Sequence, residues 1–440
     1  MTRRDKENPI NWKTLLLAGL AGSIGFSIPA VAQEDSVLVR PVMPDDFDRG
    51  RNESVAERAR PDYDPIGIHA GSFVLRPRVE TGLGYDSNIY LMKQDKTDAA
   101  YAVLAPSLQA SSAWSRHALN FTASTNLRRY FGESDRNETT WNAGTLGRLD
   151  LTSSFSLTGE AQFAKLAENT LSGAIASQQA AFSRYRRDYY SLRGEYRSGQ
   201  LRSFLKADET VFRFSDMNLS DGTFIDQGDR DRNVKRVVGQ VEYAFTPSVS
   251  AYGQGTYDWT NYDRALLLSG DDNRDSEAYR MIAGFNFDLA GMMRGTLGAG
   301  YIRRNFDSVL YRTVSGLSVE GRVEFFPSEL TTVTVQAQRL LEDSNINQTT
   351  AFFSNTLSTR VDHELLRNLI LNARGELEYQ DYLNSDRHNW LYRASTGARY
   401  LVDNRFSVAL NAQYASRTTQ AGYSSGFSDF RGQLSLIIQK

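Results

Sequence analysis

Apolar and polar residues alternate one by one along most of this chain, from about Phe73 to the C-terminus. In the segment LNARGELEY at 371–379, for example, every second residue is apolar or small, and the residues between them are Asn, Arg or Glu. Successive side chains of a β-strand point to opposite faces of its sheet, so this pattern predicts strands with one oily and one polar face.

Eighteen segments show this alternation, and the connections between them are alternately short and longer. The predicted strands span 74–90, 100–113, 117–131, 137–151, 154–168, 183–198, 201–216, 232–246, 248–263, 275–290, 293–307, 312–326, 330–343, 349–363, 368–383, 387–402, 405–419 and 425–439. An even strand number with short turns at one end is typical of bacterial outer-membrane barrels. We therefore predict an all-β fold, a transmembrane antiparallel up-and-down β-barrel of about 18 strands; one hairpin fewer or more would give about 16 or 20.

One face of each predicted strand is nearly free of charge. On the strand at 232–246, that face carries Val237, Gly239, Val241, Tyr243 and Phe245. A soluble β-sandwich, the alternative fold, would bury such a face in a dry core, but it has no reason to keep short and long connections in alternation. We therefore expect the apolar face to contact lipid and the polar face to line a lumen.

The first 72 residues differ from the rest. Basic residues are followed by an apolar run at 15–28 and by small residues that end at Ala32, a pattern typical of a secretory signal peptide cleaved after Ala32. The run is too short for a membrane-spanning anchor helix, which is the alternative. The next forty residues are rich in Pro and charge and cannot bury enough apolar surface to order themselves, apart from a candidate short helix around Glu53 to Arg60. The predicted organisation is a signal peptide at 1–32, a flexible periplasmic N-terminal arm at 33–72 and an outer-membrane β-barrel at 73–440.

The polar faces carry cations and anions in nearly equal number. The candidates for lining the lumen are Arg193, Glu195, Arg236, Glu242, Arg280, Glu320, Arg322, Glu324, Arg374, Glu376, Glu378 and Arg393. A barrel of this width holds water, so these charges are expected to stay hydrated and to stiffen the wall. Glu320 and Arg322 could also join the charges at 374–378 in one ion-pair network. Hydroxyl and amide groups on the same faces could hydrogen-bond to a sugar chain.

Composition excludes several other functions. Lys and Arg total 50 against 52 Asp and Glu, so the net charge of −2 gives no reason to expect a nucleic-acid partner. The absence of Cys excludes disulfides, thiolate metal sites and Cys nucleophiles. Only His388, near Asn384, Ser385 and Asp386, resembles the catalytic group of an outer-membrane phospholipase. The acidic loop at 271–275 lacks the Gly and Glu of a calcium loop. We therefore predict no enzyme, no cofactor and no catalytic or metal-binding residues.

Four short motifs near the start of the predicted barrel carry a resemblance to a known family. They are GLGYDSNIY at 82–90, LAPSL at 104–108, WSRHAL at 114–119 and RRYF at 128–131. With these motifs the chain resembles the putative β-barrel porin type 2 family of Gram-negative bacteria. In that family the first motif closes the first strand, and the Trp-Ser-Arg-His turn joins the second strand to the third.

The resemblance implies an outer-membrane pore, the conduit for secretion of an exopolysaccharide. Its implied partners are outer-membrane lipid, the secreted polysaccharide and a periplasmic export protein, and its location is the outer membrane of a Gram-negative cell. Two alternatives remain open: a porin for uptake of small solutes, and a non-conducting surface barrel with a structural or adhesive role. The residues themselves do not separate secretion from uptake, because no long loop is marked as a constriction or a plug.

Overall fold

The computed structural model describes residues 48–168, 183–218, 224–344, 351–383, 385–419 and 426–440. The predicted signal peptide and the first part of the predicted arm lie outside the described residues. The long strands are β2 (Phe73–Asp86), β3 (Ala99–Ser112), β4 (Ala118–Tyr130), β5 (Glu138–Asp150), β6 (Phe155–Ala167), β7 (Arg184–Ser198), β8 (Leu201–Phe214), β11 (Arg232–Thr246), β12 (Val249–Tyr262), β13 (Ser276–Leu289), β14 (Met293–Phe306), β15 (Val314–Ser328), β16 (Thr331–Asp343), β17 (Ala351–Leu366), β18 (Leu369–Tyr382), β19 (His388–Leu401), β20 (Phe406–Thr419) and β21 (Phe427–Gln439).

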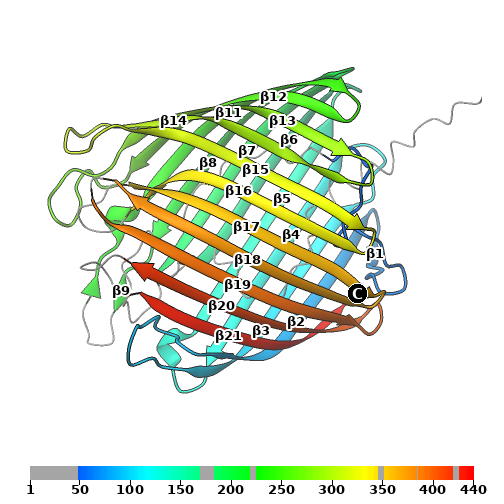
Figure 1. The fold of residues 1–440 in the computed structure, drawn as a ribbon, viewed down its shortest axis with the longest axis horizontal. Coiled ribbons are helices and arrows are strands. Elements are labelled where there is room, and N and C mark those ends of the chain that lie inside the picture. The colour runs from blue at the N-terminus through cyan, green and yellow to red at the C-terminus, as the bar shows by residue number, and fades with distance from the viewer. Residues whose placement is uncertain (1–47, 169–182, 219–223, 345–350, 384, 420–425) are drawn as a thin grey trace, which may run out of the picture.

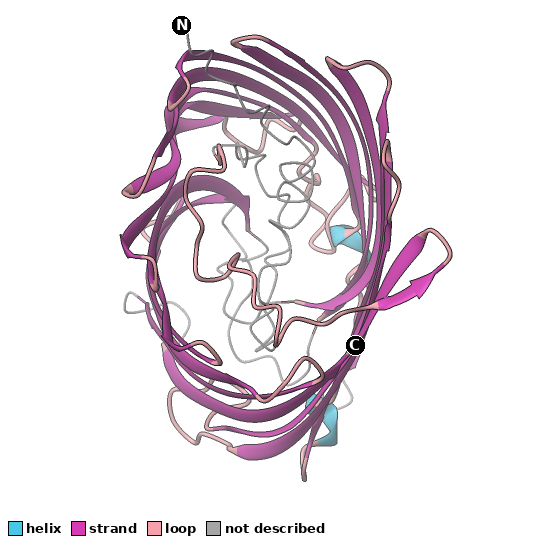
Figure 2. Cartoon of the chain, turned by 90° about the vertical axis from the view of Figure 1, so that its right-hand side faces the viewer, coloured by secondary structure: helices cyan, strands magenta, loops and turns pink. Residues whose placement is uncertain are grey.

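These eighteen strands form one closed antiparallel barrel. Each strand pairs with the next along the chain, and β21 pairs with β2 to close the sheet. The strands run obliquely side by side in Figure 1 and form a closed oval ring in Figure 2. The predicted all-β fold, an up-and-down barrel of about 18 strands, is therefore confirmed.

Short elements decorate the barrel. β1 (Ile68–Ala70) pairs antiparallel with the start of β2, and β9 (Met217–Asn218) pairs with β10 (Phe224–Ile225) between β8 and β11. Two 3-10 turns, η1 (Ser134–Arg136) and η2 (Gly228–Arg230), lie in longer connections. No helix among the described residues is long and apolar enough to cross a membrane.

Strand boundaries agree with the sequence pattern to within a few residues, and two differences have local causes. The first strand ends at Asp86 and not at 90, because the Asp86 carboxylate accepts a hydrogen bond from the Asn88 backbone N–H at 3.0 Å and begins a turn. β15 extends to Ser328 because the pairing register shifts between Phe325 and Ser328, which adds a bulge before the short turn.

The outer face of the barrel is apolar. Large side chains at every second position stay exposed, such as Met281 (66%), Val241 (56%) and Leu317 (69%). Next to the short turns this face carries aromatic rings, and the Tyr243 and Phe245 rings meet edge to face with 5.7 Å between centroids. A band of exposed apolar side chains with an aromatic border is the surface that a barrel presents to lipid.

Glycines on the inner face make room for tyrosines. The Tyr252 ring of β12 lies across Gly284 of β13 and Gly298 of β14, where an added Cβ would overlap the ring or its hydroxyl. Tyr252 is 3% exposed, and its hydroxyl donates a hydrogen bond to Glu320 of β15 at 3.1 Å. The Tyr252 side chain of β12 therefore contacts β13, β14 and β15 on the inner face of the barrel.

Candidate functional site: the inner wall of the barrel

All twelve predicted lumen-lining charges lie on strand faces opposite the exposed apolar side chains. The inward direction follows from parity: Arg236 and Glu242 alternate with exposed Val237 and Val241 on β11. Six of the twelve are nearly buried, namely Arg236, Glu242, Arg280, Glu320, Glu324 and Glu378. The expectation that such charges stay hydrated without partners is wrong for these residues, because each of the twelve makes an ion pair.

The inward charges form separate groups. Arg393 of β19 pairs with Glu376 and, at 2.8 Å, with Glu378, both of β18. On the other side of β16 and β17, Glu320 accepts hydrogen bonds from Arg280 at 2.5 Å and from the Tyr252 hydroxyl. The single network expected between Glu320, Arg322 and the charges at 374–378 is therefore not formed, because two strands lie between β15 and β18.

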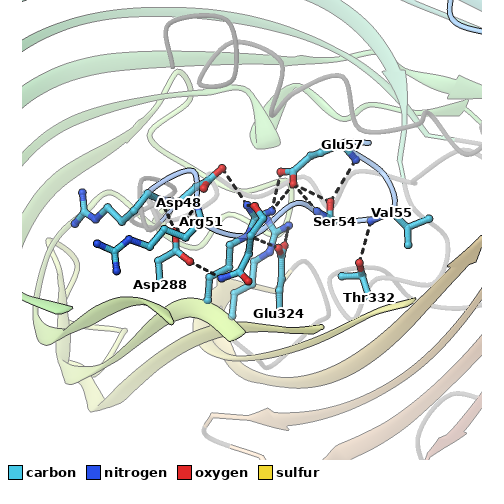
Figure 3. Close-up of polar contacts among 12 residues, drawn as sticks. Asp48, Arg51, Ser54, Val55, Glu57, Asp288, Glu324 and Thr332 are labelled. Carbon is cyan, nitrogen blue, oxygen red and sulfur yellow. Dashed lines mark hydrogen bonds and ion pairs between the residues drawn. The ribbon is translucent and has the colours of Figure 1, made fainter. Parts of the chain in front are cut away.

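Residues 48–60 follow the inner wall of the barrel at the end with the short turns, and Figure 3 shows Asp48, Ser54 and Glu57 of this segment beside Asp288 and Glu324 of the wall. Their central contact is Arg294 of β14. The guanidinium is 2.8 Å from Glu324 of β15, 2.6 Å from Glu57 and 3.0 Å from Asp48. Arg294 is 2% exposed. One buried cation on the wall therefore holds two carboxylates of the arm.

A second anchor lies beside the first, at Asp288 of β13. Its carboxylate accepts hydrogen bonds from the Arg49 backbone N–H at 2.7 Å and from the Asn52 side-chain amide at 2.5 Å. The Arg49 guanidinium also pairs with Glu242 of β11 at 2.6 Å. Asp288 and Glu242 are almost completely buried, so the arm supplies the donors that these inward carboxylates need.

A third anchor is apolar. Val55 is fully buried in a cluster with Ile370 of β18 and Leu401 of β19, and its backbone N–H donates to the Thr332 hydroxyl at 2.9 Å. Five residues on, Arg60 pairs with Glu364 of β17 at 2.6 Å and is 1% exposed. The arm therefore contacts inward residues from β11 to β19.

The pKa values of the two arm carboxylates at Arg294 are shifted in opposite directions. Burial raises the pKa of Asp48 above its usual range despite the nearby Arg294. Burial would also raise the pKa of Glu57, but the charge of Arg294 and hydrogen bonds from Ser54 outweigh it, and the Glu57 pKa is lowered. Glu57 therefore favours the bound arm as a carboxylate, whereas Asp48 resists it.

The position of the arm was missed at the sequence level. Residues 33–72 were expected to form a flexible periplasmic arm with a short helix around 53–60, whereas residues 48–60 contact the inner wall of the barrel and form a turn at 55–57. The available signal was Ser54-Val55-Ala56-Glu57, a capping-box pattern. The Ser54 backbone N–H donates to the Glu57 carboxylate at 3.0 Å, and the Glu57 N–H donates to the Ser54 hydroxyl at 3.3 Å. Such a local turn indicates order even where strand periodicity is absent.

The inner face of β3–β6 has a different chemistry. Between the ion pairs Arg128–Glu138 near one end and Arg148–Asp150 near the other, its only charged inward residue is Glu160. Its polar residues are Ser107, Gln109 and Ser111 of β3, Asn120, Thr122, Ser124 and Asn126 of β4, Thr140 and Asn142 of β5, and Ser156, Thr158 and Gln162 of β6. All of them are half-buried or exposed, so they remain accessible to water. We call these twelve residues the neutral strip; the search for charged candidates missed it.

The motif at 82–90 joins the first and last strands of the barrel. Asp86 of β2 pairs with Arg431 of β21 at 3.0 Å and accepts a hydrogen bond from the Tyr130 hydroxyl at 3.2 Å. Asn88 donates to the backbone carbonyls of Met92 and Ser428. The motif thus fixes barrel closure and the first long loop.

The Trp-Ser-Arg-His motif joins two neighbouring turns. His117, at a φ of 68°, accepts a hydrogen bond from the Asp150 N–H at 3.0 Å through Nδ1, and its own N–H donates to the Asp150 carboxylate at 3.3 Å. Arg116 donates to the Asp150 carbonyl at 2.7 Å, and the Trp114 ring meets the Phe73 ring edge to face at 5.7 Å. Both motifs therefore have structural roles.

The structure adds nothing to the catalytic candidates. The His388 ring lies 6.0 Å from the Tyr379 ring, and the Ser385 hydroxyl accepts a hydrogen bond from the Arg387 N–H. Asn384, the other member of the loop cluster, lies outside the described residues. Within the described ranges, no group of three or more His, Asp or Glu residues is arranged to hold a metal ion.

Solved structures that match the chain at low similarity include OccAB4 of Acinetobacter baumannii (TM-score 0.45, 11% identity, covering 83% of this chain and 97% of that chain). OccK3 (OpdO) of Pseudomonas aeruginosa gives a TM-score of 0.43 at 11% identity, with 83% and 95% of the two chains covered. The siderophore receptor PirA of Pseudomonas aeruginosa gives 0.42 at 11% identity, with 83% and 80% covered. At these values the similarity carries no inference about function.

None of the curated proteins is similar to the chain in sequence. The model of one family, described as Putative beta-barrel porin 2, matches residues 60–440. This range contains all eighteen barrel strands and the four motifs on which the resemblance rested. The chain therefore belongs to the Putative beta-barrel porin 2 family and is an outer-membrane β-barrel.

Proposed function

We propose that this protein is a passive pore through which small hydrophilic solutes cross the outer membrane. The observation that carries the proposal is the neutral strip, a polar and water-accessible part of the inner wall formed by β3–β6. A barrel of about 18 strands encloses more space than its inward side chains fill. Within the described residues, the arm contacts named above lie on β11 to β19 and not on the strip.

The arm supports small solutes over long polymers. Residues 48–60 are fixed to the inner wall from β11 to β19 by ion pairs and an apolar contact, so they narrow the end with the short turns. That end faces the periplasm in bacterial outer-membrane barrels. No contact among the described residues supports secretion of an exopolysaccharide, which is the role implied by the family resemblance. Uptake of small solutes is the better supported of the two directions.

Reconstitution of the purified protein tests the proposal. Planar-bilayer recording should show conductance with weak ion selectivity, because the twelve inward charges first predicted comprise six Arg and six Glu. Swelling of protein-containing liposomes should occur with small sugars and stop above a size limit. A barrel that neither conducts nor admits small solutes would be the surface structural or adhesive protein.

A deletion strain separates the two directions of transport. We expect impaired growth on particular small solutes together with normal secretion of polysaccharide. Polysaccharide retained within the cell envelope, with normal growth on small solutes, would instead identify the protein as a secretion conduit.

A further inference from the structure

We propose that the neutral strip selects uncharged, hydroxyl-rich solutes over ions of the same size, and so sets the substrate class of the pore. This inference rests on the proposed function and adds a chemical preference to it. Its basis is the placement of hydroxyl and amide groups at inward positions of four adjacent strands.

The strip offers both donors and acceptors along its whole length. Ser and Thr hydroxyls donate and accept, and Asn and Gln amides do both with different atoms. The hydroxyl groups of a polyol have the same dual character, so each can exchange water for the wall without leaving a polar group unpaired. An ion gains less, because its hydration is lost and no free opposite charge replaces it.

Two side chains of the strip have polar atoms without a protein partner. Within the described structure, the Asn120 side-chain nitrogen and the Asn126 side-chain oxygen are buried and make no hydrogen bond. Both residues point inward from β4, six residues apart, which is roughly 20 Å along a strand. Because both atoms are closed to water in this conformation, they can bond to a solute only after the side chains rotate toward the lumen.

Apart from Glu160, charge on the inner face of β3–β6 is confined to the borders of the strip. At its two ends, Arg128 pairs with Glu138, and Arg148 pairs with Asp150 at 2.9 Å. Within it, the Glu160 carboxylate accepts a hydrogen bond from the Gln162 amide at 2.5 Å and contributes one negative charge. The expected order of permeation is therefore neutral solute first, cation next and anion last.

The first test compares three solutes of similar size. Liposomes containing the purified full-length mature protein are placed in sorbitol, in glucosamine as the cation or in glucuronate as the anion, and the initial swelling rates are measured. We expect sorbitol to enter fastest and glucuronate slowest. Equal rates, or faster entry of an ion, would overturn the inference while leaving the pore itself intact. No entry of any solute would refute the proposed function instead.

Paired variants locate the selectivity. Replacing both Asn120 and Asn126 with Ala should slow sorbitol roughly two- to tenfold relative to glucosamine, since each Asn can form a hydrogen bond to the solute. The matched control is Gln336→Ala with Gln338→Ala, which removes two half-buried inward amides from β16. The control should leave the ratio unchanged. An equal effect of the two pairs would contradict selection by the strip.

An added charge provides a second comparison. Ser124→Asp places a carboxylate in the middle of the strip and should slow glucuronate most. Ser395→Asp places the same group on the inner face of β19 opposite Arg374, which can neutralise it. Heat-modifiability on gels shows that each variant is folded. If Ser395→Asp reduces glucuronate entry as strongly as Ser124→Asp, solutes do not follow the strip.

Discussion

The inner faces of β11–β15 and of β3–β6 follow the same alternation of apolar and polar residues, yet they differ in charge and in access to water. On the first wall, inward residues such as Arg236, Tyr252, Arg280, Asp288 and Glu320 are 7% exposed or less, and the arm covers its end with the short turns. The twelve residues of the neutral strip on β3–β6 are half-buried or exposed. A single barrel can thus use one side to hold an inserted segment and leave the other open to water.

The difference follows from the residues at the inward positions. Long charged side chains reach across strands and pair, and they bury one another as they do so, as Arg280 of β13 does with Glu320 of β15. Short Ser, Thr and Asn side chains remain close to the backbone and leave space in front of them. The charged inner face of β11–β15, which we call the charged wall, therefore stabilises the barrel and holds the arm. The inner face of β3–β6, which we call the neutral wall, leaves room for water and solutes.

The largest expected effect is that of Arg294→Ala on the charged wall. It leaves Glu324, Glu57 and Asp48 without their shared cation. The free energy of unfolding should therefore fall by about 3–5 kcal/mol. Urea titration in lipid vesicles measures this change. The matched substitution on the neutral wall, Asn142→Ala, should change the free energy of unfolding by no more than about 0.5 kcal/mol. Similar losses for both would remove the contrast between the walls.

The outer faces of the two walls should respond alike. Val319→Arg on β15 and Leu104→Arg on β3 each place a charge among lipid-facing side chains, at a cost of ~2–4 kcal/mol if the residue lies near the middle of the bilayer. The folded fraction after heating, read on gels, gives both values. A cost on one side only would mean that the barrel is not surrounded evenly by lipid.

The bound arm should depend on Glu57 and not on Asp48. Glu57→Gln removes a charged hydrogen-bond acceptor from Arg294 and should weaken docking by about 1–3 kcal/mol, seen as faster proteolysis of the arm and larger conductance. Asp48→Asn should leave docking unchanged or strengthen it, because burial already disfavours that carboxylate.

The same two carboxylates give a pH dependence with a defined sign. Because the Glu57 pKa is lowered in the bound arm, its contribution is present at neutral pH and is lost as the pH falls through the lowered pKa. The raised pKa of Asp48 acts in the opposite direction, since its contribution is lost as the pH rises through the raised pKa. The Asp48→Asn variant should therefore release its arm on acidification more sharply than the wild type. Unchanged proteolysis over the acidic range would contradict the assignment.

The smallest effect is expected at the half-exposed inward charges. Arg374 pairs with Glu376 at 2.5 Å but is 39% exposed. Its replacement with Ala should change barrel stability by less than about 1 kcal/mol, because water screens the pair. A loss as large as that of Arg294→Ala would show that all inward charges act alike, wherever they lie.

Most of the fold could be predicted from the sequence because strand periodicity is a local property. The alternation at 232–246 sets both the span of β11 and the direction of Val241, and the order of short and long connections sets the up-and-down topology. The inward direction of the twelve charges follows from the same parity. These features depend on neighbouring residues only, so a single sequence contains them.

The partners of the inward residues could not be predicted, because they depend on closure of the barrel. Arg49 and Asp288 are separated by 239 positions, and Arg60 and Glu364 by 304. No local pattern brings such residues together. The segment before residue 73 has the composition of a disordered arm, and only the buried charges and apolar side chains of a closed wall give it a place to bind.

The sequence alone therefore determined the strands, their inward and outward faces and the family motifs. The tertiary structure alone decided which inward charges pair, where the arm lies and which wall stays open to water. The physical reason is that side-chain direction is fixed every two residues by the strand backbone, whereas burial and ion pairing depend on distances across a closed barrel.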